Sequence, residues 1–154
     1  MNPGKRFEEK FRKSLGLRDG LPMRLQDKCF LGRDGRLLSE PSEGDFLFFG
    51  RDGHAYLIEC KATGVARFPF DKLREEQERS LLDFDAVAEN CHGLVALNFY
   101  GSDVRKDNRC FLVGIRDYLE YKRACGRKSM PLSAAEEVCT ECPRIKGAVW
   151  ELPV

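Results

Sequence analysis

The order of apolar patterns along this 154-residue chain predicts an α/β fold in which helices flank a mixed central β-sheet. Two observations carry this prediction. In some segments apolar side chains recur every three or four residues, which is typical of helices. Other segments are short apolar runs rich in aromatic and β-branched residues, which is typical of buried strands. Read in chain order, these segments give α-β-β-β-α-β-β-α, and the length predicts one domain over residues 1–154.

The helical segments are marked by spacing and by stop signals. Helices are expected over residues 6–15, 71–90 and 116–125. The first has an apolar residue at every fourth position and is followed by Gly16, a stop signal, and the second follows the chain break at Phe68-Pro69-Phe70. Ser133 and Glu136 form a capping-box pattern, which predicts the start of one more helical turn.

The strand segments are shorter and more apolar. Strands are expected over residues 45–50, 54–61, 94–100 and 110–114, with a last one over 148–152. Residues 21–38 are rich in glycine and charge, and they have room for a short strand at 23–25 and a second hairpin.

A hairpin with charged residues at its open end is the most informative pattern. Residues 51–53, Arg-Asp-Gly, are a turn signal, and a three-residue loop with Gly53 in the left-handed conformation sets the register. This register places Asp45 opposite Glu59, on the face that Lys61 also shares, because side chains alternate along a strand. A two-residue loop would instead place the two acids on opposite faces.

These three residues are suited to metal-assisted hydrolysis of a phosphodiester. Asp45 and Glu59 supply hard oxygen ligands, which suit Mg²⁺ or Mn²⁺. Such an ion lowers the pKa of bound water and neutralises charge on a phosphoryl group, and Lys61 could orient the attacking water. The alternative is an Asp at a hairpin end beside a Glu–Lys pair on a solvated strand face.

Two further residues extend the candidate site. Gln77 falls on the apolar face of its predicted helix, where a core-facing amide needs partners that a neighbouring active site would supply. Glu8 lies beside the apolar stripe of the first helix and could be another metal or water ligand. The alternatives are a glutamine at the margin of the stripe and a solvent-exposed glutamate.

Composition bounds the remaining functions. The chain is 42% hydrophobic and 33% charged, which is typical of a globular protein. Because it lacks a signal-peptide pattern and an apolar run of membrane-spanning length, we expect a cytoplasmic protein with reduced cysteines. The net charge is only +1, but residues 1–36 hold ten Lys and Arg against five Asp and Glu. Such basic segments fit a polyanion such as DNA, or are solvated surface.

Other chemistries have weaker support. Cys139 and Cys142 form a C-T-E-C half-site for zinc, but no second half-site exists, so structural zinc is not expected. His54 and His92 have no nucleophile context. No glycine-rich nucleotide-binding loop occurs in the sequence.

The spacing of Asp45, Glu59 and Lys61 resembles the PD-(D/E)XK nuclease signature. Other blocks are similar to the RecU-type Holliday-junction resolvases, also called the penicillin-binding protein-related factor A family. They are the N-terminal residues 2–8 (N-x-G-x-x-[LF]-E), residues 59–63 (E-A-K-x-T), Phe68-Pro69 with Gln77 (F-P-x7-Q) and the strand at residues 93–99. The resemblance therefore runs in order from Asn2 to about Gly114.

This resemblance implies a restriction-endonuclease-like core and a homodimeric, metal-dependent endodeoxyribonuclease of DNA recombination and repair. It implies that a Mg²⁺ or Mn²⁺ ion is held by Asp45, Glu59 and the backbone carbonyl of Cys60, and that Lys61 assists the water. By the same resemblance Gln77 supports the site and Glu8 is an accessory acid.

The resemblance also implies residues that meet the substrate. These are Lys5, Arg6, Thr63 and Arg67, expected at the DNA. The family carries a stalk that engages the centre of a four-way junction, and here residues 16–44 are expected to be too short for a full stalk.

Three other functions remain open at this point. A nuclease of the same class could act in repair, replication or restriction, on flaps, ends or ordinary duplex. A protein of the same fold could bind DNA without cutting it. A zinc-stabilised interaction module would rest on the two cysteines of the half-site alone.

Overall fold

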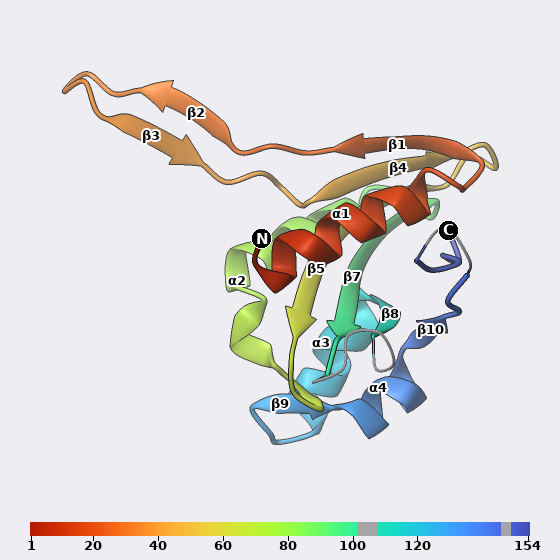
Figure 1. Ribbon diagram of the computed structural model, residues 1–154. Coiled ribbons are helices and arrows are strands. Elements are labelled where there is room, and N and C mark those ends of the chain that lie inside the picture. The colour runs from red at the N-terminus through yellow and green to blue at the C-terminus, as the bar shows by residue number, and fades with distance from the viewer. Residues whose placement is uncertain (102–107, 146–148) are drawn as a thin grey trace.

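A mixed six-stranded sheet forms the centre of the computed structural model, which describes residues 1–101, 108–145 and 149–154 (Figure 1). Its strand order is β1-β4-β5-β7-β8-β10, and every neighbouring pair is antiparallel except β5 and β7. The strands are β1 (Gly20–Arg24), β4 (Phe46–Gly50), β5 (Ala55–Thr63), β7 (Cys91–Phe99), β8 (Arg109–Gly114) and β10 (Thr140–Cys142). The predicted α/β class with a mixed sheet is confirmed.

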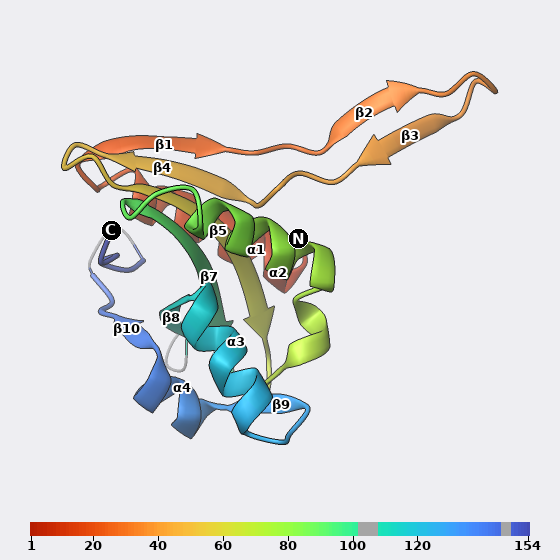
Figure 2. The ribbon, with the colours of Figure 1, turned by 180° about the vertical axis from the view of Figure 1, so that it is seen from behind.

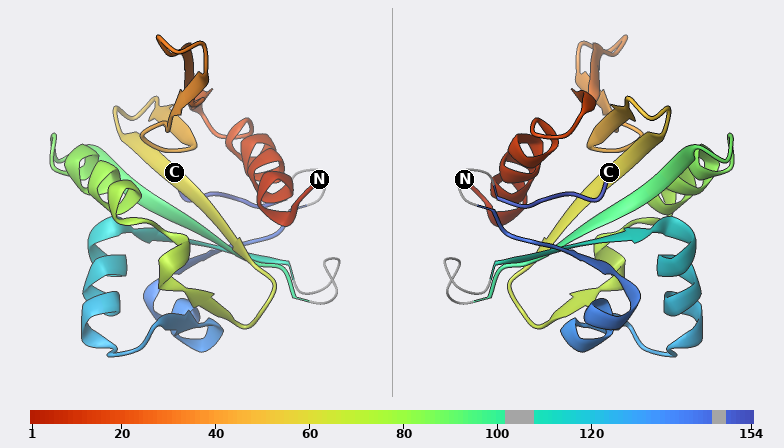
Figure 3. Two further views of the ribbon diagram at one scale, coloured as in Figure 1. Left: turned by 90° about the vertical axis from the view of Figure 1, so that its left-hand side faces the viewer. Right: turned by 90° about the vertical axis from the view of Figure 1, so that its right-hand side faces the viewer.

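Helices cover both faces of this sheet. They are α1 (Pro3–Leu15), α2 (Glu75–Asp85), α3 (Ile115–Ala124) and α4 (Leu132–Val138), with a 3-10 turn, η1 (Phe70–Lys72). α1 lies on one face and α2 and α3 on the other (Figures 2 and 3). No helix in the described part of the chain is long and apolar enough to cross a membrane.

Each face of the sheet has its own apolar core, and β5 contributes to both. Leu57 packs with the residues under α2 and α3, whereas Ile58 and Cys60 pack with those under α1. Alternation along the strand therefore sends the side chains of Glu59 and Lys61 towards the α2 side.

The first helix forms as its spacing predicts. The side chain of Asn2 accepts a hydrogen bond from the Lys5 amide at 2.8 Å and caps the helix, and Pro3 occupies the first turn, where its missing N–H is not needed. The apolar stripe, which includes Phe7 and Phe11, is buried against the sheet. α1 is thereby fixed against the sheet, chiefly over β5.

The predicted hairpin register is confirmed. Phe46 pairs with Ile58, the Gly50 amide donates to the His54 carbonyl at 2.8 Å, and Gly53 has a φ of 87°. The regular ladder stops at Phe46, so the acids at the open end lie just beyond it.

Several boundaries differ from the expectation. The helix predicted over 71–90 divides into η1 and the shorter α2, because Leu73 is extended and the chain after Asp85 must turn into β7. α4 begins at Leu132 after Pro131 without a side-chain cap, so the predicted Ser133–Glu136 capping box is wrong.

The C-terminal part was predicted least well. Of the strand expected over 148–152, residue 148 lies outside the described residues, and 149–152 form no strand. Trp150 instead makes an isolated bridge with Arg144 and packs edge-on against Phe7, with ring centroids 5.4 Å apart. Three short strands were not predicted, namely β6 (Arg67–Pro69), β9 (Ser129–Pro131) and β10.

A two-stranded arm projects from the body between β1 and β4. It consists of β2 (Lys28–Leu31) and β3 (Leu37–Glu40), which pair only with each other (Figure 1). The predicted second hairpin is therefore present, and the short strand expected at 23–25 overlaps β1. The segment expected to be too short for a full stalk does form an extended arm.

Candidate active site

The candidate site extends from Glu59, in the middle of β5, to the carboxyl end of this strand, where α1 and η1 approach the sheet. An open hollow at this end has ten lining residues, which are Asn2, Pro3, Gly4, Lys5, Glu8, Cys60, Lys61, Ala62, Lys72 and Tyr100. Carboxyl ends of parallel strands are common ligand sites in α/β folds, and β5 and β7 are the parallel pair here.

Glu59 is the most buried charged group of the site. Its side chain is 6% exposed, and its Oε1 atom accepts from Lys61 Nζ at 2.7 Å and from Gln77 Nε2 at 2.6 Å. Gln77 is held in turn, because its Oε1 accepts from the Arg74 amide at 3.1 Å at the start of α2. The amide expected to support the site therefore contacts the carboxylate directly.

Asp45 is fixed by the same strand. Its Oδ2 accepts from the Cys60 amide at 2.7 Å, and its own amide donates to the Ile58 carbonyl at 2.9 Å. Burial and, next, the charge of Glu59 raise the pKa of Asp45 to about 7, although the Cys60 N–H opposes both. Two acids thus share one partly desolvated place.

The pKa of Glu59 is also raised, chiefly by burial, and the Lys61 ammonium opposes this shift. Glu59 pairs with Lys61, whereas Asp45 has no ion-pair partner among the described residues. A cation at this place would relieve that cost, because charge buried without a partner is expensive.

Glu8 lies close to this pair but has another partner. It accepts from Arg24 of β1 at 2.9 Å, and its charge raises the pKa of both Asp45 and Glu59. The structure thus brings together Glu8 of α1, Asp45 directly before β4, Glu59 and Lys61 of β5, and Gln77 of α2.

The donor set fits a hard divalent cation. Each acid spends one oxygen on the bonds above, and the other oxygen, Asp45 Oδ1 or Glu59 Oε2, has no hydrogen-bond donor within the described ranges. Cys60, which follows Glu59 and whose amide donates to Asp45, lines the hollow. Over the residues that the structure describes, no group of three or more His, Cys, Asp or Glu could hold a metal. A cation here would therefore complete its shell with the Cys60 carbonyl, water and substrate oxygens, as Mg²⁺ commonly does.

The residues expected at DNA lie in different places. Lys5 lines the hollow, whereas Arg6 lies on the other side of α1, and Arg67 lines a separate hollow beside α3. Thr63 is 2% exposed and its hydroxyl donates to the Arg67 carbonyl at 3.1 Å. Thr63 therefore braces the turn after β5, and its buried position does not favour the expected contact with DNA.

One cation of the hollow was not predicted. Lys72 is carried there by η1, and its Nζ donates to the Ala62 carbonyl at 2.8 Å. The sequence around Lys72 has no pattern that distinguishes it from other lysines. Lys72 reaches the end of β5 because the 3-10 turn after Pro69 carries it there.

The C-T-E-C pair does not form one site. Cys139 packs with the core under α2 and α3, whereas Cys142 packs with the core under α1, opposite Cys110 of β8. All seven cysteines are free thiols.

A scan against protein-family models gives no match, and no curated protein sequence matches the chain. The geometry of the site therefore carries the functional argument.

Proposed function

We propose that the protein is a metal-dependent endodeoxyribonuclease built on a restriction-endonuclease-like core. The single observation that carries the proposal is the meeting of two partly desolvated acids, a lysine and a glutamine around the centre of β5. The resemblance of Asp45, Glu59 and Lys61 to the PD-(D/E)XK signature supports the same chemistry.

In this proposal Asp45, Glu59 and the Cys60 carbonyl hold Mg²⁺ or Mn²⁺, which supplies Lewis-acid stabilisation of the phosphoryl charge. The Cys60 N–H fixes the Asp45 carboxylate, and Gln77 fixes that of Glu59. Lys61, which is 2.7 Å from Glu59, orients the attacking water and stabilises charge on the phosphorus oxygens. Lys5 and Lys72 at the rim attract the DNA backbone.

A second observation favours branched DNA over ordinary duplex. The arm of β2 and β3 extends away from the body where β1 ends and β4 begins (Figure 2), and Asp45 directly precedes β4. If the protein is resolvase-like, the arm corresponds to the stalk that engages a junction. A homodimer would provide the two sites that paired cuts need.

The test is cleavage of labelled DNA with Mg²⁺ or Mn²⁺. Asp45→Ala and Lys61→Ala should fold yet lose activity by at least ~10²-fold, whereas Lys13→Ala and Asp83→Ala, at exposed positions, should keep it. Full activity in either site variant would exclude this assignment, and DNA binding without cleavage in either metal would favour a non-catalytic DNA-binding protein.

The same assay compares a four-way junction, a flap and a linear duplex at equal salt, since non-specific affinity depends steeply on salt. A variant with residues 26–41 replaced by a short turn should lose any junction preference and keep cleavage of duplex. An unchanged preference would assign selectivity to another surface, and sedimentation of the complex would test the homodimer.

A further inference from the structure

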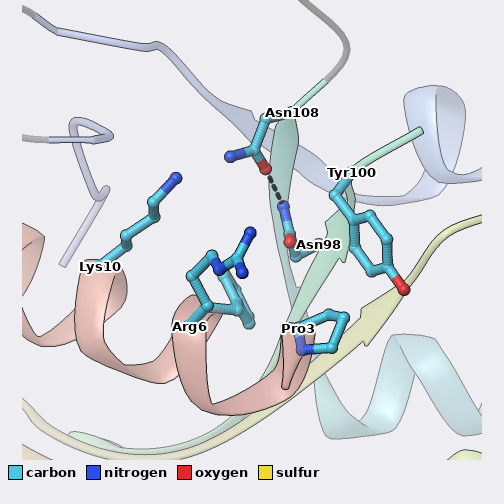
Figure 4. Close-up of a pocket in the computed structure, with 7 residues that line it drawn as sticks. Pro3, Arg6, Lys10, Asn98, Tyr100 and Asn108 are labelled. Carbon is cyan, nitrogen blue, oxygen red and sulfur yellow. Dashed lines mark hydrogen bonds between the residues drawn. The ribbon is translucent and has the colours of Figure 1, made fainter. Parts of the chain in front are cut away.

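A small pocket lies on the α1 side of the sheet, opposite the face on which Glu59 and Gln77 meet. Arg6 and Lys10, one turn apart on α1, point into it from one side, and Asn98 and Asn108 face them from the ends of β7 and β8 (Figure 4). Tyr100 closes a further side. These residues have no part in the proposed catalysis.

The two asparagines are buried at the base of the pocket and are held by hydrogen bonds. Asn98 is 3% exposed and Asn108 is 5% exposed. The Asn98 amide donates to Asn108 Oδ1 at 2.5 Å and to the Arg109 carbonyl at 2.9 Å. These bonds fix the orientation of both amides, so that the Asn108 nitrogen is turned towards the Lys10 side of the pocket (Figure 4).

The pocket concentrates positive charge. Its described lining holds Arg6 and Lys10 and no carboxylate. Burial lowers the pKa of Lys10, and the nearby charges of Arg144 and Arg6 lower it further. Cations gathered in a partly desolvated place repel one another, and a bound anion would offset that cost.

The size of the pocket limits the anion. Its volume is about 50 Å³, whereas one water needs ~10–15 Å³ on this measure. A compact tetrahedral group fits, but a base with its sugar does not. Arginine matches phosphate oxygens with a fork of donors, and lysine adds a point charge.

The pocket is also next to the candidate active site. Pro3 and Tyr100 line both hollows, so only the start of α1 separates them. A strand that leaves the hollow over Lys61 and passes Tyr100 would reach the pocket with its end. Two cations match a terminal phosphate, which carries a charge of about −1.5 to −2 at pH 7, better than they match a singly charged diester.

We propose that Arg6, Lys10, Asn98 and Asn108 form a binding site for the terminal phosphate of a nucleic-acid strand. The identity of the strand rests on the proposed function, whereas phosphate binding itself does not. The site selects strands that end in a phosphate monoester near the candidate active site.

The test is binding of a fluorescent single strand that carries either a 5′-phosphate or a 5′-hydroxyl, in buffer with EDTA so that no cleavage intervenes. The phosphorylated strand should bind ~10-fold or more tightly, as two charge-assisted contacts imply. Arg6→Gln and Lys10→Gln should each reduce this ratio towards one. Lys13→Gln, which removes the same charge one turn away on an exposed face of α1, should preserve it. Inorganic phosphate at millimolar concentration should compete with the phosphorylated strand.

Equal affinity of the two strands for the wild type would overturn the proposal, as would a ratio that survives both pocket substitutions. Arg6 is exposed, so its variant remains informative if Lys10→Gln fails to fold. If the protein cleaves DNA but binds the two strands equally, the nuclease proposal is unaffected and the terminal-phosphate site is excluded. Stabilisation by inorganic phosphate that Arg6→Gln abolishes, with no binding of either strand, would overturn the strand-end assignment, whereas the nuclease is tested separately by the cleavage assay with Mg²⁺ or Mn²⁺.

Discussion

Two hairpins in this protein have the same four-residue turn sequence, but the strands of one are buried and those of the other are exposed. Gly-Arg-Asp-Gly occurs at residues 32–35 in the arm and at 50–53 between β4 and β5. In both turns the amide of the first glycine donates a hydrogen bond of 2.8 Å across the loop, to the carbonyl of Arg36 in the arm and of His54 in the other hairpin. The last glycine has a positive φ in both, 78° for Gly35 and 87° for Gly53. Identical sequence gives nearly identical turn geometry.

The flanking strands differ completely in burial. Phe46, Phe48 and Ile58 are at most 1% exposed between α1 and the rest of the sheet, whereas Phe30 and Leu31 of the arm are 50% and 73% exposed. A turn is thus encoded within a few residues, but burial depends on partners elsewhere in the chain. The buried hairpin holds Asp45 at its open end, where burial raises the pKa of this acid to about 7.

The largest expected contrast is in stability. Phe48→Ala removes a fully buried ring and should lower the free energy of unfolding by ~3–5 kcal/mol, whereas Phe30→Ala should change it by no more than ~0.5 kcal/mol. Urea denaturation of both variants measures this. Equal losses would show that the arm packs on a surface of the body or of a second molecule in solution.

Stability should also depend on pH through Asp45. Between the ordinary pKa of 3.8 and about 7, folded Asp45 keeps a proton that the unfolded chain has released. The folded state is therefore favoured at low pH, and stability falls as pH rises through this window. A shift of this size corresponds to at most ~4 kcal/mol, and partial exposure of the side chain makes the measured loss smaller.

Asp45→Asn keeps an acceptor for the Cys60 amide and removes the charge, so it should be more stable than the wild type at pH 8 and nearly equal at pH 4. Urea denaturation across pH measures the difference, with Asp83→Asn, at an exposed position, as the control. Mg²⁺ should restore stability at pH 8 in the wild type but not in Asp45→Asn. A pH profile unchanged by Asp45→Asn would contradict the raised pKa.

Local patterns in the sequence were sufficient for the elements that build the site. The hairpin register could be predicted because loop length and Gly53 fix it, and Gln77 because helical spacing places it on an inward face. The exposure of the arm could not be predicted, because no local pattern shows whether another element covers Phe30 and Leu38, and the sheet ends at β1 without covering them.

Residues that meet only through tertiary structure were also missed. Asn98 and Asn108 are brought together by the pairing of β7 with β8, and Lys10 faces them only because α1 crosses the ends of these strands. None of the three has a local signal, since each lies in a segment whose pattern is explained by its own strand or helix. The burial of Thr63, which the resemblance placed at the DNA, was not predicted either, because it depends on the turn that follows β5.

The smallest expected effect compares the two turns directly. Gly53→Ala and Gly35→Ala place a methyl group where no atom lies within 4 Å, so neither substitution meets a steric clash. The cost in each is the positive φ, ~1–2 kcal/mol for an L-residue. In Gly53→Ala this cost should appear in the free energy of global unfolding, because the hairpin is part of the buried sheet.

In Gly35→Ala the same cost should leave global unfolding unchanged, because the arm pairs only with itself and can open alone. It should appear instead as faster hydrogen exchange of the Gly32 amide, which closes that turn. Asn tolerates the left-handed conformation, so Gly53→Asn should cost less than Gly53→Ala. Equal losses of global stability in the two alanine variants would mean that the arm unfolds with the body, and that its exposed strands are held by something other than their own hydrogen bonds.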